Sequence, residues 1–146
     1  MSLKTDQQAP ARPMEPQVQP LTRGYPEMHQ DGASLAPTNY LVSVYTGDVP
    51  GAGTDGDVWV WFDGTAGRSG PPWRYIDNGN DNFERNVTDY FTLTLPNIGT
   101  PIACWVYFRP SGIAPDWYLS TITVNDKVFS YYTWITQEGM YRLTTT

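Results

Sequence analysis

The feature that most restricts how this chain can fold is a series of short runs of β-forming residues with turn residues between them. These runs are rich in Val, Ile, Thr and aromatic residues, and Gly, Pro, Asn or Asp separate them. The runs are residues 40–46, 57–62, 90–95, 102–108, 117–124 and 128–134, with shorter candidates at 73–76 and 141–144. No stretch has a helical period, and strands do not alternate with helices, so a parallel sheet is disfavoured. We therefore predict an all-β fold, with the strands in a sandwich or barrel.

The period of two within the runs places alternate side chains on opposite faces of each strand. In residues 57–62, Val58, Val60 and Phe62 alternate with Trp59 and Trp61. Residues 102–108 are almost continuously apolar, as expected of a central strand. Aromatic residues make up 14% of the chain and charged residues only 16%, a balance that suits a pleated, half-buried surface.

The first 38 residues have a different composition. They are rich in proline and glutamine, and their few apolar residues follow no period. Such a segment buries too little surface to offset the entropy of ordering it. We predict that residues 1–38 form a disordered or extended N-terminal tail and that residues 39–146 form a single domain. The tail is either a plain linker or a tether that docks on a partner.

Several catalytic arrangements are disfavoured by residue counts. The only histidine, His29, lies in the tail, and the only cysteine, Cys104, lies within an apolar run. A Ser-His-Asp or Cys-His pair therefore cannot form in the domain. Residues 51–56 match the G-x-G-x-x-G pattern, but they precede a predicted strand rather than a helix, so a dinucleotide site is not expected. We predict that the protein is not an enzyme.

Charge and hydropathy exclude further partners. The net charge is −6 and no basic stripe is present, so nucleic acid is not an expected ligand. No apolar run approaches the roughly 20 residues that a transmembrane helix needs. No signal peptide is visible in this chain, and the sequence leaves its compartment and oligomeric state open.

Two predicted loops, residues 46–57 and 77–84, are dense in oxygen-bearing side chains and glycine. Calcium takes six to eight oxygen ligands from carboxylates, amides and carbonyls, and glycine lets backbone carbonyls turn toward such an ion. The alternative is a pair of solvated turns that use Asn, Asp and Gly for their backbone dihedrals. A third loop ends at Asp116, at the entrance of a strand, from which the Asp116 carboxylate could point into the loop cluster.

These loops and strands together resemble the PLAT domain, a family named from polycystin, lipoxygenase and alpha-toxin. The similar segments occur in the family's order. They are residues 40–48, 51–55, 77–78, 82–85, 88–91, 111–112 and 115–119. The resemblance implies a sandwich of two four-stranded antiparallel sheets. It also implies binding without catalysis, on a lipid surface or a protein partner, with calcium as the cofactor of those members that bind a metal.

Matching position by position, the resemblance assigns two sets of residues. The metal ligands would be the carboxylates of Asp55, Asp77 and Asp81, with further oxygens from Asn78 and Asp116 and from the backbone near Gly53 and Gly79. Apolar loop tips that contact a membrane or partner would be Val49, Pro50, Pro72 and Trp73. Trp73 is the leading contact because an exposed indole suits a lipid interface; packing under a neighbouring loop is its alternative.

Three functions remain open at this point. The first is a calcium-responsive module that docks on lipid or protein through its loops. The second is a structural component of a larger assembly that needs no metal and pairs through sheet edges. The third is a carbohydrate-binding module that stacks sugars on exposed Trp59, Trp61 and Trp73.

Overall fold

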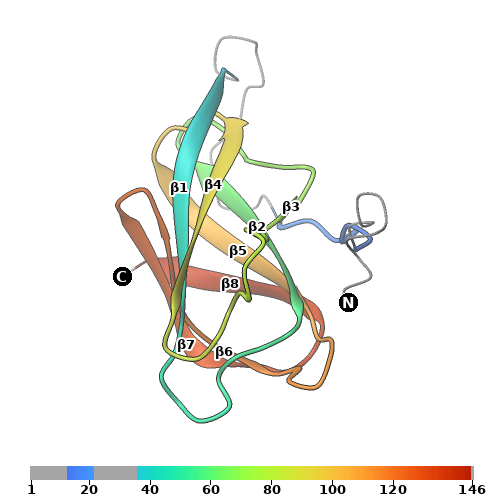
Figure 1. Ribbon diagram of the computed structural model, residues 1–146. Coiled ribbons are helices and arrows are strands. Elements are labelled where there is room, and N and C mark those ends of the chain that lie inside the picture. The colour runs from blue at the N-terminus through green and yellow to red at the C-terminus, as the bar shows by residue number, and fades with distance from the viewer. Residues whose placement is uncertain (1–12, 22–35, 146) are drawn as a thin grey trace.

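The computed structural model describes residues 13–21 and 36–145, and in this part of the chain all regular structure is β-strand (Figure 1). Each run predicted from the sequence forms a strand, including the two short candidates. The strands are β1 (Pro37–Thr46), β2 (Asp57–Gly64), β3 (Arg74–Tyr75), β4 (Thr88–Pro96), β5 (Pro101–Arg109), β6 (Trp117–Val124), β7 (Lys127–Ile135) and β8 (Gly139–Thr145). The predicted all-β, antiparallel class is confirmed.

The strands form two four-stranded layers that are joined along one side. Their order is β3-β2-β5-β8-β7-β6-β1-β4, and every pairing is antiparallel. The β7–β8 ladder consists of the pairs Phe129–Thr145 and Ser130–Thr144. Because this short ladder links the layers, the sandwich is one eight-stranded sheet folded over on itself.

The main core lies between the two layers. Val58, Val60 and Phe62 of β2 point into it, and Val42 and Val44 of β1 face them from the other layer. All five side chains are fully buried. Burying aliphatic and aromatic side chains in this way supplies most of the stability of such a domain.

A second aromatic cluster lies on the outer face of the β3-β2-β5-β8 layer. It contains Trp59 and Trp61, which alternate with the core residues of β2, together with Trp73 and Trp105. Trp59, Trp61 and Trp73 are only 2%, 1% and 4% exposed. An outer sheet face this deeply buried must be covered by another part of the chain.

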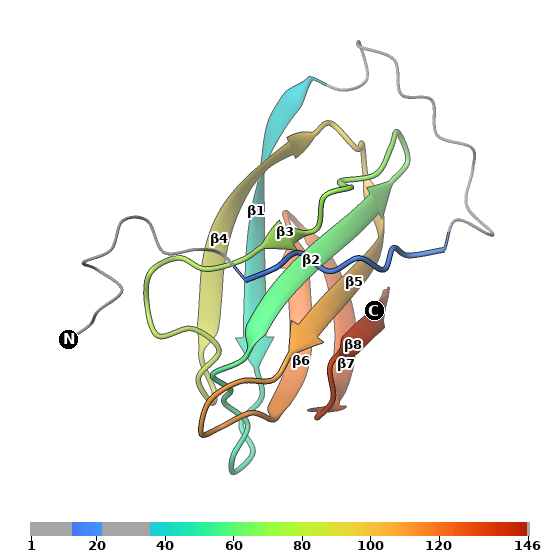
Figure 2. The ribbon, with the colours of Figure 1, turned by 90° about the vertical axis from the view of Figure 1, so that its right-hand side faces the viewer.

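Residues 13–21 cover that cluster. They form neither helix nor strand, as predicted for an extended tail, but they are packed against the domain, with Pro16 and Pro20 buried. Figure 2 shows the segment (blue) running across the β3-β2-β5 side of the molecule. Predictions about residues 1–12 and 22–35, including the position of His29, concern residues outside the described part of the chain.

Candidate functional site

Three loops meet at one end of the sandwich: residues 47–56 between β1 and β2, residues 76–87 between β3 and β4, and residues 110–116 between β5 and β6. We call this end the loop pole. The Thr54 amide donates to the Phe83 carbonyl (3.1 Å), and the Asp55 amide donates to the Ala114 carbonyl (2.8 Å). The Thr54 hydroxyl is buried and donates to the same Ala114 carbonyl (3.1 Å). Backbone hydrogen bonds therefore tie the central loop to both of its neighbours.

An open cavity of about 170 Å³ lies between the first two loops and the start of β2. Four carboxylates, from Asp55, Asp57, Asp77 and Asp81, are among its lining residues. Its remaining lining includes Asn82 and Phe83. The lining comes from two separate segments, residues 54–58 and 75–83, so the cavity depends on the tertiary fold.

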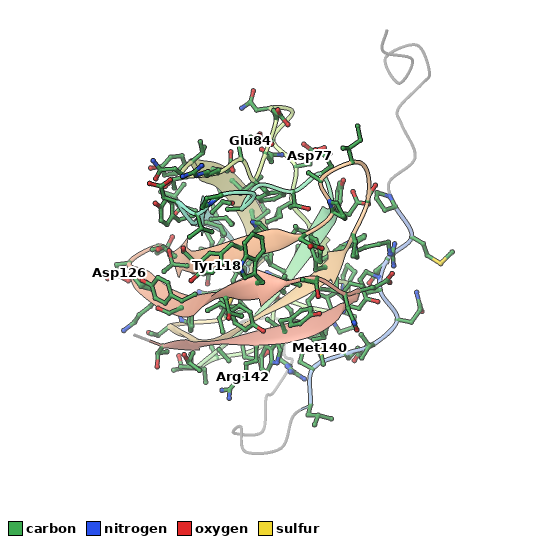
Figure 3. All side chains as sticks on the ribbon, turned by 90° about the horizontal axis from the view of Figure 1, so that it is seen from below. Asp77, Glu84, Tyr118, Asp126, Met140 and Arg142 are labelled. Carbon is green, nitrogen blue, oxygen red and sulfur yellow. The ribbon has the colours of Figure 1, made fainter. Side chains whose placement is uncertain are left out.

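The charge at this cavity is strongly negative. Glu84 lies at its edge, and its pKa is raised by partial burial and then by the negative charges of Asp81 and Asp55. Figure 3, which looks along the molecule from the loop pole, shows Asp77 and Glu84 on the same side. A group whose ionised form is disfavoured by neighbouring carboxylates indicates a site that would gain energy from a bound cation.

Several carboxylate oxygens already accept local hydrogen bonds. Asp77 Oδ1 accepts from the Gly79 amide (2.9 Å) and from Asn82 Nδ2 (3.1 Å). Asp57 Oδ1 accepts from the Tyr75 hydroxyl (2.9 Å). The Gly79 bond is that of an Asx turn, the alternative raised by the sequence, and the three bonds leave each carboxylate with further lone pairs.

Asn82 has the property expected of a cation ligand. Its Oδ1 is buried and has no hydrogen-bond partner in the structure. The next residue, Phe83, is buried and has a φ of 63°, in the left-handed region that costs a non-glycine residue energy. Its amide is held by Asp89 Oδ2 (2.8 Å). A buried amide oxygen without a donor is costly, and calcium would satisfy it.

The donor set fits calcium in kind, because all of the available ligands are oxygens. The side chains lie further apart than in a closed coordination shell. Within residues 13–21 and 36–145, no three Asp, Glu, His or Cys side chains converge on one point. Asp55, Asp77 and Asp81 with the amide oxygen of Asn82 are the residues that would hold the ion.

The structure separates the sequence-predicted metal ligands into two groups. It brings Asp55, Asp77 and Asp81 to one cavity and leaves the other four outside the cavity lining. Asn78 is engaged elsewhere, because its Nδ2 donates to the Tyr90 carbonyl (3.1 Å). The others outside the lining are Gly53, Gly79 and Asp116. Asn82 was not among the predicted ligands; its place in the residue 77–84 loop was the only sequence signal for it.

The predicted contact residues also separate. Val49 and Pro50 lie in a turn at the loop pole, where the Ala52 amide donates to the Val49 carbonyl (3.0 Å). The prediction that Trp73 projects from a loop tip is wrong, because its indole is buried and donates to the Val18 carbonyl (2.6 Å). Pro72 is exposed, but it neighbours the buried Trp73 and lies outside the three loops of the loop pole.

Burial of the tryptophans also contradicts the carbohydrate hypothesis as stated. Trp59, Trp61 and Trp73 were expected to be exposed stacking platforms, and each is at most 4% exposed. They lie beneath residues 13–21 and against one another, because the outer sheet face is covered by the chain itself.

The apolar tip at the loop pole is a residue that sequence reasoning missed. Ile113 is 97% exposed and lies in the residue 110–116 loop. The neighbouring Ala114 amide donates to Asp55 Oδ2 (3.3 Å), so Ile113 stands next to a cavity carboxylate. An apolar residue between glycine and alanine in a predicted loop was the available signal.

Comparison with known proteins identifies the fold and family. The PLAT/LH2 domain model matches residues 40–146. Lipoxygenase homology domain-containing protein 1 of Mus musculus is 41% identical over 87 residues, 60% of this chain and 4% of that protein. Polycystin-1-like protein 3 of Homo sapiens is 34% identical over 97 residues, 66% of this chain and 6% of that protein. The chain thus spans only a few per cent of the length of these curated relatives.

Solved structures show the same architecture. A coral 8R-lipoxygenase, described as activated by calcium via a C2-like domain, superposes with a TM-score of 0.65 at 22% identity over 74% of this chain and 17% of that chain. The alpha-toxin of Clostridium absonum superposes with a TM-score of 0.60 at 22% identity, covering 80% of this chain and 33% of that one. The domain model matches all eight strands except for the first residues of β1. This chain therefore belongs to the PLAT/LH2 domain family.

Proposed function

We propose that the protein is a non-catalytic docking module that binds a lipid surface through its loop pole when calcium is present. The observation that carries the proposal is the cavity lined by Asp55, Asp77 and Asp81, with the unpartnered Asn82 oxygen beside it. The described calcium activation of the coral lipoxygenase via its C2-like domain supports the same role for the corresponding module here.

The role of calcium follows from the charges. The protein carries a net charge of −6, and the loop pole gathers four cavity carboxylates and Glu84 at one end. An anionic lipid surface repels such an end until a divalent cation neutralises it. A bound ion would also tie the residue 47–56 loop to the residue 76–87 loop, since Asp55 comes from one and Asp77 from the other.

Apolar insertion would then come from the loop tips. Ile113 is almost fully exposed beside Asp55, and Val49 and Pro50 lie in the adjacent loop. Inserting an exposed aliphatic side chain into hydrocarbon gains roughly 1.5–3 kcal/mol. This contribution is enough to make docking measurable but not enough to hold the protein on a membrane without the electrostatic part.

Liposome flotation tests the proposal. Wild-type protein should float with phosphatidylserine-containing vesicles in calcium and not in EDTA. Ile113→Ala and the double variant Asp77→Asn/Asp81→Asn should both lose flotation. Leu41→Ala is the matched control, because Leu41 is an exposed aliphatic residue on β1, away from the three loops, and should float normally.

Loss of flotation in Ile113→Ala tests the apolar part of the mechanism, and loss in Asp77→Asn/Asp81→Asn tests the calcium-dependent part. Calcium should also raise the melting temperature of the wild type by binding the folded state, and it should not do so for Asp77→Asn/Asp81→Asn. An unchanged melting temperature in calcium and EDTA would remove the metal from the proposal. Absence of flotation in both conditions would contradict lipid docking and shift the role of the loop pole to a protein partner.

A further inference from the structure

The outer face of the β3-β2-β5 layer carries an aromatic surface that is distinct from the loop pole and reaches its cavity only at Tyr75. We call it the aromatic face, and it consists of Trp59, Trp61, Trp73, Tyr75, Trp105 and Tyr107. Its rings contact one another: Trp73 lies 5.4 Å from Trp61 and 5.9 Å from Tyr107 between ring centroids, both edge to face. Most β-sandwiches expose polar residues on this face, so its composition calls for a ligand.

Two arginines flank the aromatic face and are held in place by it. The Arg68 guanidinium lies 5.1 Å from the ring centre of Trp61, and the Arg109 guanidinium lies 4.8 Å from that of Trp59. Both are also fixed by carboxylates: Arg68 by Asp63 (2.6 Å) and Arg109 by Glu138 (3.1 Å). Guanidinium groups fixed in this way present oriented N–H donors at low entropic cost.

Those donors hold the residue 13–21 segment mainly through its backbone. Arg109 Nη1 donates to the Met14 carbonyl (2.8 Å), and Arg68 Nη2 donates to the Pro20 carbonyl (3.4 Å). Between them, Trp73 Nε1 donates to the Val18 carbonyl (2.6 Å). These three contacts accept any extended peptide that presents carbonyls at the same spacing.

Specificity comes from three side chains of the segment. Pro16 and Pro20 are buried against the domain, and Glu15 Oε2 accepts from the Trp73 amide (3.1 Å). Aromatic grooves with an indole donor are a recurrent way of recognising extended proline-rich segments, because such segments lose little entropy when they bind. Although residues 13–21 belong to the same chain, they make the contacts of a peptide ligand.

We propose that the aromatic face is a binding site for this proline-rich segment as a ligand, and that the segment of a second copy of the chain can occupy it. Residues 22–35 connect the segment to β1, and fourteen residues span at most about 50 Å. A segment on such a connection can reach the aromatic face of a neighbouring molecule. Exchange of identical elements in this way links copies with no new type of contact.

The first experiment asks whether the segment is docked and replaceable. In full-length Pro16→Asp/Pro20→Asp, buried charge should expel the segment, shift tryptophan emission to the red and increase acrylamide quenching. A synthetic peptide of residues 13–21 should reverse both changes with a dissociation constant below about 1 mM. The matched control is Gln17→Asp/Gln19→Asp, which adds the same charge at exposed positions and should behave like wild type.

The second experiment tests exchange between whole chains. Trp73→Phe/Arg109→Met removes two donors but leaves the segment intact, whereas Pro16→Asp/Pro20→Asp leaves the donors intact and damages the segment. Each variant alone should be a monomer by analytical ultracentrifugation, and their mixture should form a heterodimer that the free peptide dissociates. Far-UV circular dichroism of both variants checks that the sandwich is folded.

Three results would overturn the proposal. Unchanged quenching in Pro16→Asp/Pro20→Asp would mean that the segment does not protect the tryptophans. No binding of the peptide up to about 1 mM would mean that the face does not take a separate ligand. Peptide binding without a heterodimer in the mixture would exclude a second copy as its source. None of these results bears on calcium or on lipid flotation, because the loop pole is unaltered in every variant.

Discussion

The buried ion pair between Asp63 and Arg68 gives the sharpest stability prediction. Asp63 lies near the end of β2 on the outer face, and its side chain is completely buried, while that of Arg68 is 13% exposed. The pair is bidentate, with Arg68 Nε 2.6 Å from Oδ1 and Nη2 2.9 Å from Oδ2. Trp61 Nε1 donates to Oδ1 as well (3.1 Å). Arg68→Met would leave the Asp63 carboxylate buried with a single neutral donor.

The size of the loss follows from what remains after the substitution. Breaking a buried pair by removing one partner costs about 3–5 kcal/mol, because the other charge stays desolvated. The remaining indole hydrogen bond to Asp63 contributes on the order of 1 kcal/mol and places the expected loss at the lower end, at about 3 kcal/mol. Methionine does not reproduce the contact of the Arg68 guanidinium with the Trp61 ring (5.1 Å to the ring centre) or its bond to the Pro20 carbonyl, and losing them adds to this figure.

Urea unfolding followed by circular dichroism measures this loss. Arg85→Met is the matched control, because Arg85 makes the same kind of pair with Asp48 (2.9 Å) but both side chains are at least half exposed. That control should cost less than about 1 kcal/mol. Asp63→Asn/Arg68→Met should recover most of the stability, since no buried charge is left. A loss below about 1 kcal/mol for Arg68→Met, or no recovery in the double variant, would refute the reasoning.

Three further predictions concern single groups elsewhere in the domain. The raised pKa of Glu84 means that its ionised form opposes folding; Glu84→Gln should therefore raise the melting temperature at pH 7 in EDTA by about 1–3 °C, and the gain should vanish as pH falls through the pKa of Glu84. A deficit at pH 7 would contradict this sign. Thr46→Val removes the hydroxyl that accepts from the buried Trp117 Nε1 (2.9 Å) and should cost about 1–3 kcal/mol in urea unfolding, whereas a neutral result would mean that the indole finds another partner. Burial raises the pKa of the Cys104 thiol, so iodoacetamide at pH 8 should modify it only after denaturant is added; rapid modification of the native protein would show that β5 opens.

The sequence alone was sufficient to locate the strands. Alternation within residues 57–62 placed Val58, Val60 and Phe62 on one face of β2 and Trp59 and Trp61 on the other, and the structure shows that the first set lies in the main core. A period of two has this power because neighbouring side chains on a strand must point to opposite faces. The turn-rich segments between strands also marked the acidic loops that carry Asp55, Asp77 and Asp81, which the structure brings to one cavity.

Details within the loops were beyond the sequence. Asn78 and Asn82 have the same side chain and lie in the same loop, but one amide binds the Tyr90 carbonyl and the other is buried with an unpartnered oxygen. Loop dihedrals such as the positive φ of Phe83 decide which of them faces the cavity. These dihedrals depend on contacts with other loops, so local composition does not encode them.

The outer face of the sheet was decided by tertiary structure alone. Sequence patterning placed Trp59 and Trp61 together on one side of β2, but it contained no information on which side faces the core or on what would cover the other side. The covering residues lie in the tail, and the bond from Trp73 to Val18 joins positions 55 residues apart. Hydrophobic period and residue propensity describe neighbours along a strand or turn. A contact between the tail and the sheet face depends instead on shape and hydrogen-bond complementarity, which exist only once the tail and the sheet are both placed in space.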